Sequence, residues 1–120
     1  MAQFKTDTLE ALRGQQEIAI RTGKHPSSTV TIWVVVADDE VFVRSVRGPK
    51  GRWYRDLAKG GPATLQVGGH DVPVEAIPAT DSAAVERASR AYLCKYSASP
   101  YAESMVRPET LPTTLRLEPR

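Results

Sequence analysis

Cysteine is almost absent from this chain of 120 residues, in which Cys94 is the only one. A single cysteine excludes an internal disulfide and suits a reducing compartment, so we expect a cytoplasmic protein. We interpret Cys94 as a core or half-buried residue, because its surroundings are apolar and helical. Long apolar runs are also missing. The longest, Ile32–Ala37, is far too short to span a bilayer, and the start MAQFKTDTLEALRG lacks the apolar run of a signal peptide, so no membrane association is expected.

Catalytic and metal-binding motifs are missing as well. The chain has no G-x-S-x-G, no phosphate-binding loop of the G-x-x-x-x-G-K-[ST] type and no H-E-x-x-H. Its two histidines, His25 and His70, have no cysteine or acid at metal-ligand spacing, so we expect no metal site. No nucleophile can be paired with a base, which argues against hydrolytic chemistry and leaves catalytic residues unidentified.

Positive charge is concentrated rather than abundant. The net charge is only +2, yet five of the sixteen Lys and Arg lie within residues 44–55. The one acid of this part of the chain, Asp56, follows directly after them. The five are Arg44, Arg47, Lys50, Arg52 and Arg55. The stretch reads as strand, glycine-bearing loop and short helix, an order that can gather backbone N–H groups and cations around a phosphate or another anion. The alternative interpretation is a solvated face on which arginine stems cover apolar surface.

The periodicity of the apolar residues predicts six strands and three helices in one domain, residues 1–120. Residues 29–37 form the strongest strand, which we expect to be central and covered on both faces. It is followed by the turn 38–40 and a partner strand over 41–46, and Gly68-Gly69 joins a second hairpin. Further strands are expected over 17–21 and 113–118, and helices over 6–13, 52–59 and 82–96. Without regular βαβ alternation, this order favours a mainly β fold, a small antiparallel barrel flanked by helices.

The element order and one motif resemble the split-barrel flavin-binding superfamily. The motif is S-x-R-G-x-x-x-x-W-Y-x-x-L, carried here by Ser45, Arg47, Gly48, Trp53, Tyr54 and Leu57, with the small-residue break 60–63 after it. That superfamily includes pyridoxamine-phosphate oxidase-like proteins and deazaflavin-dependent nitroreductases. The chain is most similar to an uncharacterised bacterial family of this fold. The resemblance implies a six-stranded antiparallel split β-barrel flanked by helices.

The resemblance also implies a ligand and the residues that hold it. In such proteins a flavin-type cofactor lies in a groove at a homodimer interface, and basic and hydroxyl groups hold its phosphate. Carried over, the phosphate-binding residues are Arg44, Ser45, Arg47 and Lys50, and the aromatic pair beside the cofactor is Trp53 and Tyr54. This chain has a shorter N-terminal segment and a shorter loop than deazaflavin-dependent relatives. FMN, deazaflavin and loss of the cofactor therefore remain open.

Three functions follow as hypotheses. The first is an oxidoreductase in which the bound cofactor carries the chemistry on a small-molecule substrate. The second is a non-enzymatic small-ligand or interaction module that kept the fold. The third, nucleic-acid binding with Trp53 and Tyr54 as stacking platforms, ranks last because the basic residues do not extend into a stripe. Core packing is the competing interpretation of Trp53, and also of Tyr92, Tyr96, Tyr101 and Met105, which we consider for the substrate side.

Overall fold

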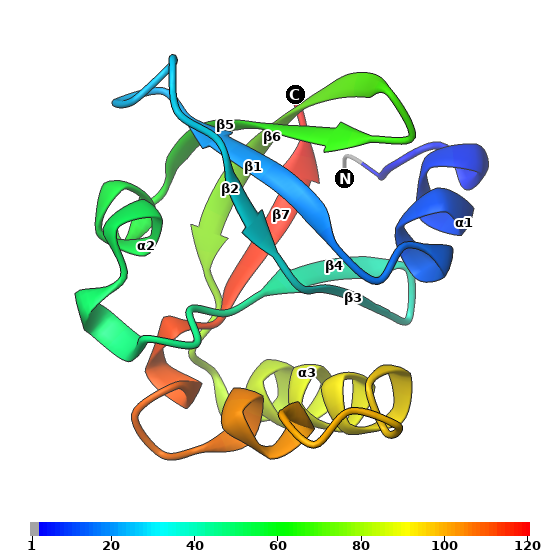
Figure 1. The fold of residues 1–120 in the computed structure, drawn as a ribbon, viewed down its shortest axis with the longest axis vertical. Helices are drawn as coiled ribbons and strands as arrows, with labels where there is room; N and C mark the ends of the chain where they lie inside the picture. The colour runs from blue at the N-terminus through cyan, green and yellow to red at the C-terminus, as the bar shows by residue number, and fades with distance from the viewer. Residues whose placement is uncertain (1–2) are drawn as a thin grey trace.

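The computed structural model describes residues 3–120, which form one antiparallel sheet with three α-helices around it (Figure 1). The helices are α1 (Thr6–Gly14), α2 (Arg52–Leu57) and α3 (Ser82–Lys95), with the 3-10 turns η1 (Gly48–Lys50), η2 (Ala102–Val106) and η3 (Leu111–Thr113). The strands are β1 (Ile18–Thr22), β2 (Val30–Ile32), β3 (Val34–Ala37), β4 (Glu40–Val43), β5 (Gly61–Val67), β6 (His70–Pro78) and β7 (Leu115–Pro119). In the described residues, no helix has the length and apolar character needed to cross a membrane.

The sheet has seven strands, so the prediction of six is wrong. The expected central strand over 29–37 is broken at Trp33 into β2 and β3. The hydrogen-bonded order is β2-β1-β5-β6-β7-β4-β3, which puts the two halves of this one chain segment at opposite ends of the sheet. Because Trp33 joins those ends covalently, the sheet curls into a nearly closed, barrel-like shape (Figure 1).

The same break explains why the expected burial on both faces holds for only half of the segment. β3 pairs with β4 from Val34↔Val43 to Ala37↔Glu40, and its first residues are fully buried. β2 pairs with β1 alone, and Val30 remains 39% exposed. The two-residue turn of Asp38 and Asp39, both with positive φ, matches the type I′ geometry that suits the right-handed twist of a hairpin.

Two apolar cores lie on the two sides of β3 and β4. Alternate residues of these strands, including Val34 and Val41, point into the barrel and pack with Leu65 and Leu115. The residues between them, such as Val35, face outward against α3. The interior core is closed at one end by α1, and α2 covers it on the opposite side of the barrel (Figure 1).

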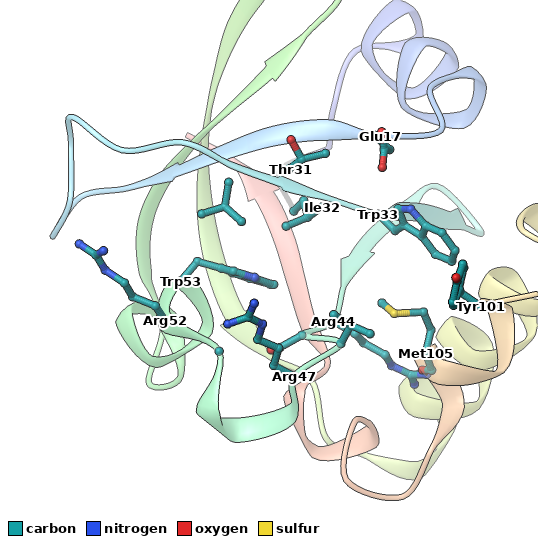
Figure 2. Close-up of a pocket in the computed structure, with 14 residues that line it drawn as sticks. Glu17, Thr31, Ile32, Trp33, Arg44, Arg47, Arg52, Trp53, Tyr101 and Met105 are labelled. Atoms are coloured by element: carbon teal, nitrogen blue, oxygen red, sulfur yellow. The ribbon is translucent and has the colours of Figure 1, made fainter. Parts of the chain in front are cut away.

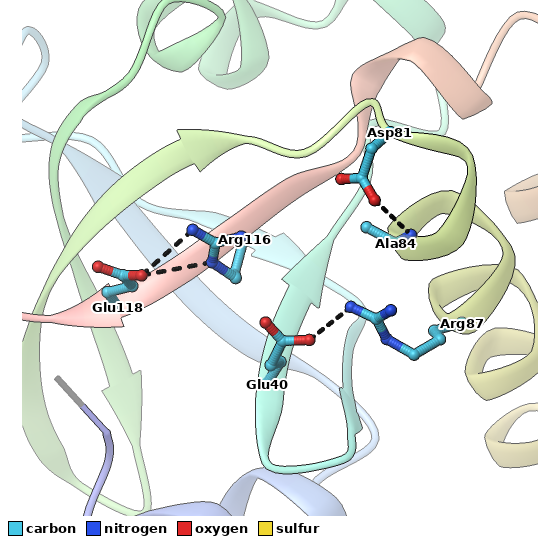
Figure 3. A network of polar contacts seen from close by, with 6 residues as sticks. All are labelled: Glu40, Asp81, Ala84, Arg87, Arg116 and Glu118. Carbon is cyan, nitrogen blue, oxygen red and sulfur yellow. Dashed lines mark hydrogen bonds and ion pairs between the residues drawn. The ribbon is translucent and has the colours of Figure 1, made fainter. Parts of the chain in front are cut away.

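Polar contacts fix α3 to the outside of the barrel (Figure 3). The Asp81 carboxylate accepts a hydrogen bond from the Ala84 N–H at 3.0 Å and so caps the first turn of this helix. One turn further on, Arg87 pairs with Glu40 at the start of β4 at 2.6 Å. Cys94, which the sequence suggested for a buried position, is exposed on this helix.

Candidate functional site

A pocket opens where the β3–β4 ladder stops. The last pair of that ladder is Val34↔Val43, and the same register would next join residues 30–33 to residues 44–47. Instead β2 turns away to pair with β1, and the chain after β4 runs toward η1. All eight residues of these two segments line a pocket of about 510 Å³. The pocket is thus the gap between two segments whose continuations, β3 and β4, pair with each other. Its size suits a small molecule.

Other elements close the sides of the pocket. The start of α2 contributes Arg52 and Trp53, and the turn η2 region contributes Tyr101 and Met105 (Figure 2). The full lining is Glu17, Val30, Thr31, Ile32, Trp33, Arg44, Ser45, Val46, Arg47, Gly51, Arg52, Trp53, Tyr101 and Met105. Of the six residues predicted for cofactor binding, the pocket therefore gathers Arg44, Ser45, Arg47 and Trp53. Lys50 and Tyr54 lie outside the lining.

Arg44 is almost completely buried at the base of this pocket, at 1% exposure. Its Nε donates to the Thr114 hydroxyl at 2.8 Å, and Nη1 donates to the Ser89 hydroxyl at 2.8 Å. The carbonyls of Met105 and Val85 accept from Nη1 and Nη2 at 2.9 and 2.8 Å. Four of the five N–H groups are thus bound by protein, so Arg44 connects four segments of the chain and has little capacity left for a direct phosphate contact.

The charge of Arg44 has no carboxylate beside it. Burial lowers the pKa of Arg44 below its ordinary value, but a guanidinium stays charged in proteins. The Tyr92 ring, 5.7 Å away, and the dipoles of the accepting groups are what stabilise this charge inside the fold. A buried cation without a counter-charge favours an anion in the adjacent pocket.

The ion pairing of the arginines follows a pattern across the described chain. Each arginine outside the 44–55 stretch pairs with a carboxylate, namely Arg13, Arg21, Arg87, Arg90, Arg107, Arg116 and Arg120. Within residues 3–120, no carboxylate lies at ion-pair distance from Arg44, Arg47, Arg52 or Arg55. Three of these four arginines line the pocket, so the pocket holds three guanidinium groups that no ion pair within the described residues neutralises.

Ser45 and Gly51 meet at the wall of the pocket. The Ser45 N–H donates to the Thr113 hydroxyl at 3.0 Å, which holds this buried residue against the turn η3. Gly51 lies so close to the Ser45 hydroxyl that a Cβ at position 51 would overlap with that oxygen. The glycine before α2 is therefore required by close approach, since its φ of −59° is available to any residue.

Arg47 and Arg52 are the exposed cations of the pocket. Both are solvent-accessible, and Arg47 extends toward the Trp53 ring whereas Arg52 extends outward at the edge (Figure 2). Lys50 is also exposed but lies in η1, outside the lining. The basic side chains that can reach a ligand directly are accordingly Arg47 and Arg52, and the second was missing from the predicted set.

The aromatic residues divide between core and pocket. Trp53 does both, because it belongs to the interior core at 8% exposure and its ring also borders the pocket. Tyr54 packs at the edge of the same core, and its hydroxyl lies 3.5 Å from the Pro112 carbonyl. Tyr92 is fully buried and does not line the pocket, so of its two interpretations core packing is the one that holds. Tyr101 and Met105 do line it.

Trp33 is a further pocket residue that sequence reasoning missed. Its ring stacks on Tyr96 with 3.9 Å between ring centroids and 3° between planes. The Tyr96 hydroxyl donates to the Gln16 carbonyl at 2.7 Å and accepts from the Val34 N–H at 3.2 Å, and burial raises the pKa of Tyr96 to about 12. Tyr96 therefore sits behind Trp33 and does not reach the pocket itself. In the sequence, Trp33 reads as one more strand residue.

Asp56, the acid of the basic stretch, is directed away from the arginines. Its Oδ2 accepts from the Thr22 hydroxyl at 2.7 Å and lies 2.5 Å from His25 Nδ1. Burial by itself would raise the pKa of Asp56, but the hydrogen bonds from Thr22 and His25 outweigh it and lower the pKa. This acid fastens α2 to the end of β1 and does not neutralise the pocket. No group of three His, Cys, Asp or Glu in the described chain is arranged to hold a metal ion.

Comparison with solved structures supports the fold. The chain is similar to a solved structure, the conserved hypothetical protein Rv2991 from Mycobacterium tuberculosis, with a TM-score of 0.61 and 10% identity over 98% of this chain and 79% of that one. At this identity the likeness shows the fold alone. No curated protein matches the chain. The family model described as "Uncharacterized protein conserved in bacteria (DUF2255)" matches residues 8–117, and the chain belongs to that family.

Proposed function

We propose that the pocket binds a phosphate-bearing flavin-type cofactor, FMN or a deazaflavin, and that the protein is an oxidoreductase acting on a small molecule. The observation that carries this proposal is the group of pocket arginines without carboxylate partners. Arg44 places an uncompensated charge beneath the pocket, and Arg47 and Arg52 add two exposed cations at its edge. A phosphate supplies the missing negative charge, and an arginine fork binds its oxygens in matching geometry.

The rest of the lining fits the remainder of such a molecule. Indole rings at two places, Trp33 and Trp53, offer flat apolar surfaces for a planar ring system, and Val30 and Ile32 extend that surface. Arg47 and Arg52 would hold the phosphate, and the Ser45 hydroxyl would add a neutral donor. Arg44 would act through its charge, because most of its donors are already bound.

When bound, such a cofactor supplies the hydride or electron chemistry itself. The protein's own residues bind and orient it, and the apolar lining keeps water away from its ring. Glu17 is the only acid that lines the pocket, and no histidine or cysteine does so. This lining suits a reaction in which the cofactor, rather than an acid–base pair of the protein, does the chemical work.

A homodimer belongs to this proposal. Val46 is 50% exposed and Tyr101 is 68% exposed, and both lie at the pocket together with Val30 at 39%. A second protomer would cover these apolar side chains and shield the ring of the cofactor from solvent.

The test is a titration of purified protein with FMN and, separately, with a phosphate-bearing deazaflavin. We expect one of the two to bind, and we expect Arg47→Ala to weaken that binding by about 1.5–3 kcal/mol, the range for a charge-assisted hydrogen bond. Arg55→Ala is the matched control, because Arg55 is equally exposed but lies outside the pocket. Failure of both cofactors to bind, or equal losses in the two variants, would overturn the proposal.

A second function is favoured by one observation. The pocket lining has no histidine, no cysteine and no paired acid and base. Such a lining also suits a non-enzymatic module that only binds a small ligand. Protein that binds FMN or deazaflavin but never changes its oxidation state with any electron donor would support this second function.

A further inference from the structure

The positive charge of the molecule extends beyond the pocket onto the outward surface around α2. We define the basic face as Lys24, Lys50, Arg55 and Lys59, together with the pocket-edge residues Arg47 and Arg52. All six are exposed, and in the described residues no carboxylate pairs with any of them. Asp56 is the one acid in this segment, and its contacts with Thr22 and His25 draw it away from the surface.

One phosphate in the pocket cannot balance this face. A phosphate monoester carries at most two negative charges, and the residues that reach it are Arg47 and Arg52. Lys24, Lys50, Arg55 and Lys59 lie outside the pocket lining. The charge of Asp56 acts on Lys24, whereas Lys50, Arg55 and Lys59, which lie within ten residues of one another, repel each other unless something outside the chain compensates them.

We propose that the basic face docks an acidic surface of a partner protein at the edge of the pocket. Charge complementarity of this kind increases the rate of encounter and sets the orientation of the two proteins. Arginines, which make up half of the face, are also enriched at protein interfaces. This inference rests on the proposed function in one respect only, the identity of the molecule that the docked partner would meet in the pocket. The charge pattern that supports docking is independent of the cofactor.

Nucleic acid fits this face less well than an acidic protein does. The outward part of the face on and around α2 offers no freely exposed ring for base stacking, because the Trp53 ring is turned toward the core and the pocket and Tyr54 packs at the edge of the core. The six cations are also local. The remaining ten Lys and Arg of the chain stand against thirteen of its fourteen Asp and Glu, so an extended polyanion would run onto a surface of its own sign.

A second copy of this chain is also a poor occupant. A two-fold contact brings the same patch of both protomers together, so the cations of one protomer would face those of the other. The apolar side chains at the pocket rim, rather than the basic face, are the surface proposed above for the second protomer. The basic face thereby remains open to a partner of opposite charge.

The probe is a fluorescein-labelled peptide of 20 residues in which Glu and Asp alternate with Ala and Ser, measured by anisotropy at 150 mM salt. We expect Arg55→Glu/Lys59→Glu to weaken its binding at least tenfold. The control is Lys5→Glu/Arg90→Glu, which changes the charge equally at exposed positions outside the face, and we expect less than a twofold change. No binding by the wild type, or equal losses in both variants, would overturn the proposal.

Two parallel measurements separate the other occupants and the cofactor. In the first, the protein is titrated with a single-stranded oligonucleotide of 20 thymidines. If the oligonucleotide binds more tightly than the peptide and through the same residues, the partner of the basic face is a nucleic acid and not an acidic protein. In the second, the molecular mass of Arg55→Glu/Lys59→Glu is measured by sedimentation. A mass lower than that of the wild type would show that the basic face binds a second copy of the chain. FMN or deazaflavin affinity should not change in this variant, because neither residue lines the pocket. Docking can therefore fail while cofactor binding holds, and the reverse.

Discussion

At the scale of single residues, Arg44 and Ser45 are neighbours with different roles. The resemblance to split-barrel proteins implied that both are phosphate ligands. In the fold, Arg44 donates four hydrogen bonds to protein acceptors. The Ser45 side chain, in contrast, lines the pocket next to Gly51. Which groups a side chain already satisfies is decided by residues 41–70 positions away, so the sequence around position 44 carries no sign of it.

Gly51 gives a prediction at this scale. Gly51→Ala should lower the free energy of unfolding by about 1–3 kcal/mol, because the added methyl group overlaps with the Ser45 hydroxyl. Removing that oxygen by Ser45→Ala in the same chain should restore most of the loss, as coupled neighbours do in a double-mutant cycle. Urea denaturation of the four proteins measures the coupling. Additive effects would show that the two residues do not contact each other in this way.

At the scale of elements, the break between β2 and β3 creates both the barrel and the pocket. Side chains of α3 take over the backbone groups around Trp33: the Tyr92 hydroxyl donates to the Trp33 carbonyl at 3.0 Å, and Lys95 Nζ donates to the Val34 carbonyl at 2.7 Å. Backbone groups that leave a ladder need such partners when they are buried. The helix thus makes the change of strand partner possible.

Tyr96 tests this account of the break. Tyr96→Phe should destabilise the fold by about 1–3 kcal/mol, because the Gln16 carbonyl and the Val34 N–H both lose their partner while the stack on Trp33 remains. Thermal or urea unfolding measures the change. Tyr101→Phe, which removes the hydroxyl of an exposed tyrosine, should stay within about 0.5 kcal/mol. A Tyr96→Phe protein as stable as the wild type would contradict this role.

The attachment of α2 to β1 predicts a pH dependence. The folded pKa of Asp56 is lowered, so its contribution is present above the unfolded pKa of about 3.9 and is lost as the pH falls through the folded value. Asp56→Asn should therefore cost about 1–2 kcal/mol at pH 7 and progressively less below pH 4. Unfolding curves from pH 3 to 7 test this, with Glu10→Gln on the exposed face of α1 as control. A difference that does not shrink in acid would contradict it.

At the scale of the whole molecule, charge is distributed unevenly over a chain whose net charge is small. The arginines of the remaining surface sit in ion pairs, whereas those of the 44–55 stretch do not. A pattern of this kind lowers stability slightly through repulsion and leaves one side of the molecule ready for anions. The pocket and the basic face are two parts of that side.

Salt gives the whole-molecule prediction. At 20 mM ionic strength, Lys50→Gln/Arg55→Gln should be more stable than the wild type by about 0.3–1 kcal/mol, because two repelling cations are removed. At 500 mM the difference should disappear, since screening shortens the reach of each charge to a few ångströms. Chemical unfolding at the two ionic strengths, in a buffer without phosphate, measures it. A variant less stable than the wild type at low salt would show that these cations have partners in the fold.

The sequence by itself determined the elements and the charge. Apolar periodicity located the three α-helices, and turn residues marked the β3–β4 and β5–β6 hairpins, because these patterns depend on neighbours a few positions apart. The basic stretch and the missing catalytic motifs could also be read directly. The strand count was the element-level error, because nothing within residues 29–37 marks Trp33 as a break.

Only the tertiary structure decided where the site lies and which residues form it. The pocket exists because β2 and β3 pair with different neighbours, and pairing partners are a long-range property of the closed sheet. The lining also differs from the predicted set. It excludes Lys50 and Tyr54 and includes Trp33, Arg52 and Glu17, because the path of the chain around the gap decides which side chains reach it. The burial of Arg44 without a counter-charge likewise depends on three distant segments, α3, η2 and the residue before β7, meeting around one guanidinium.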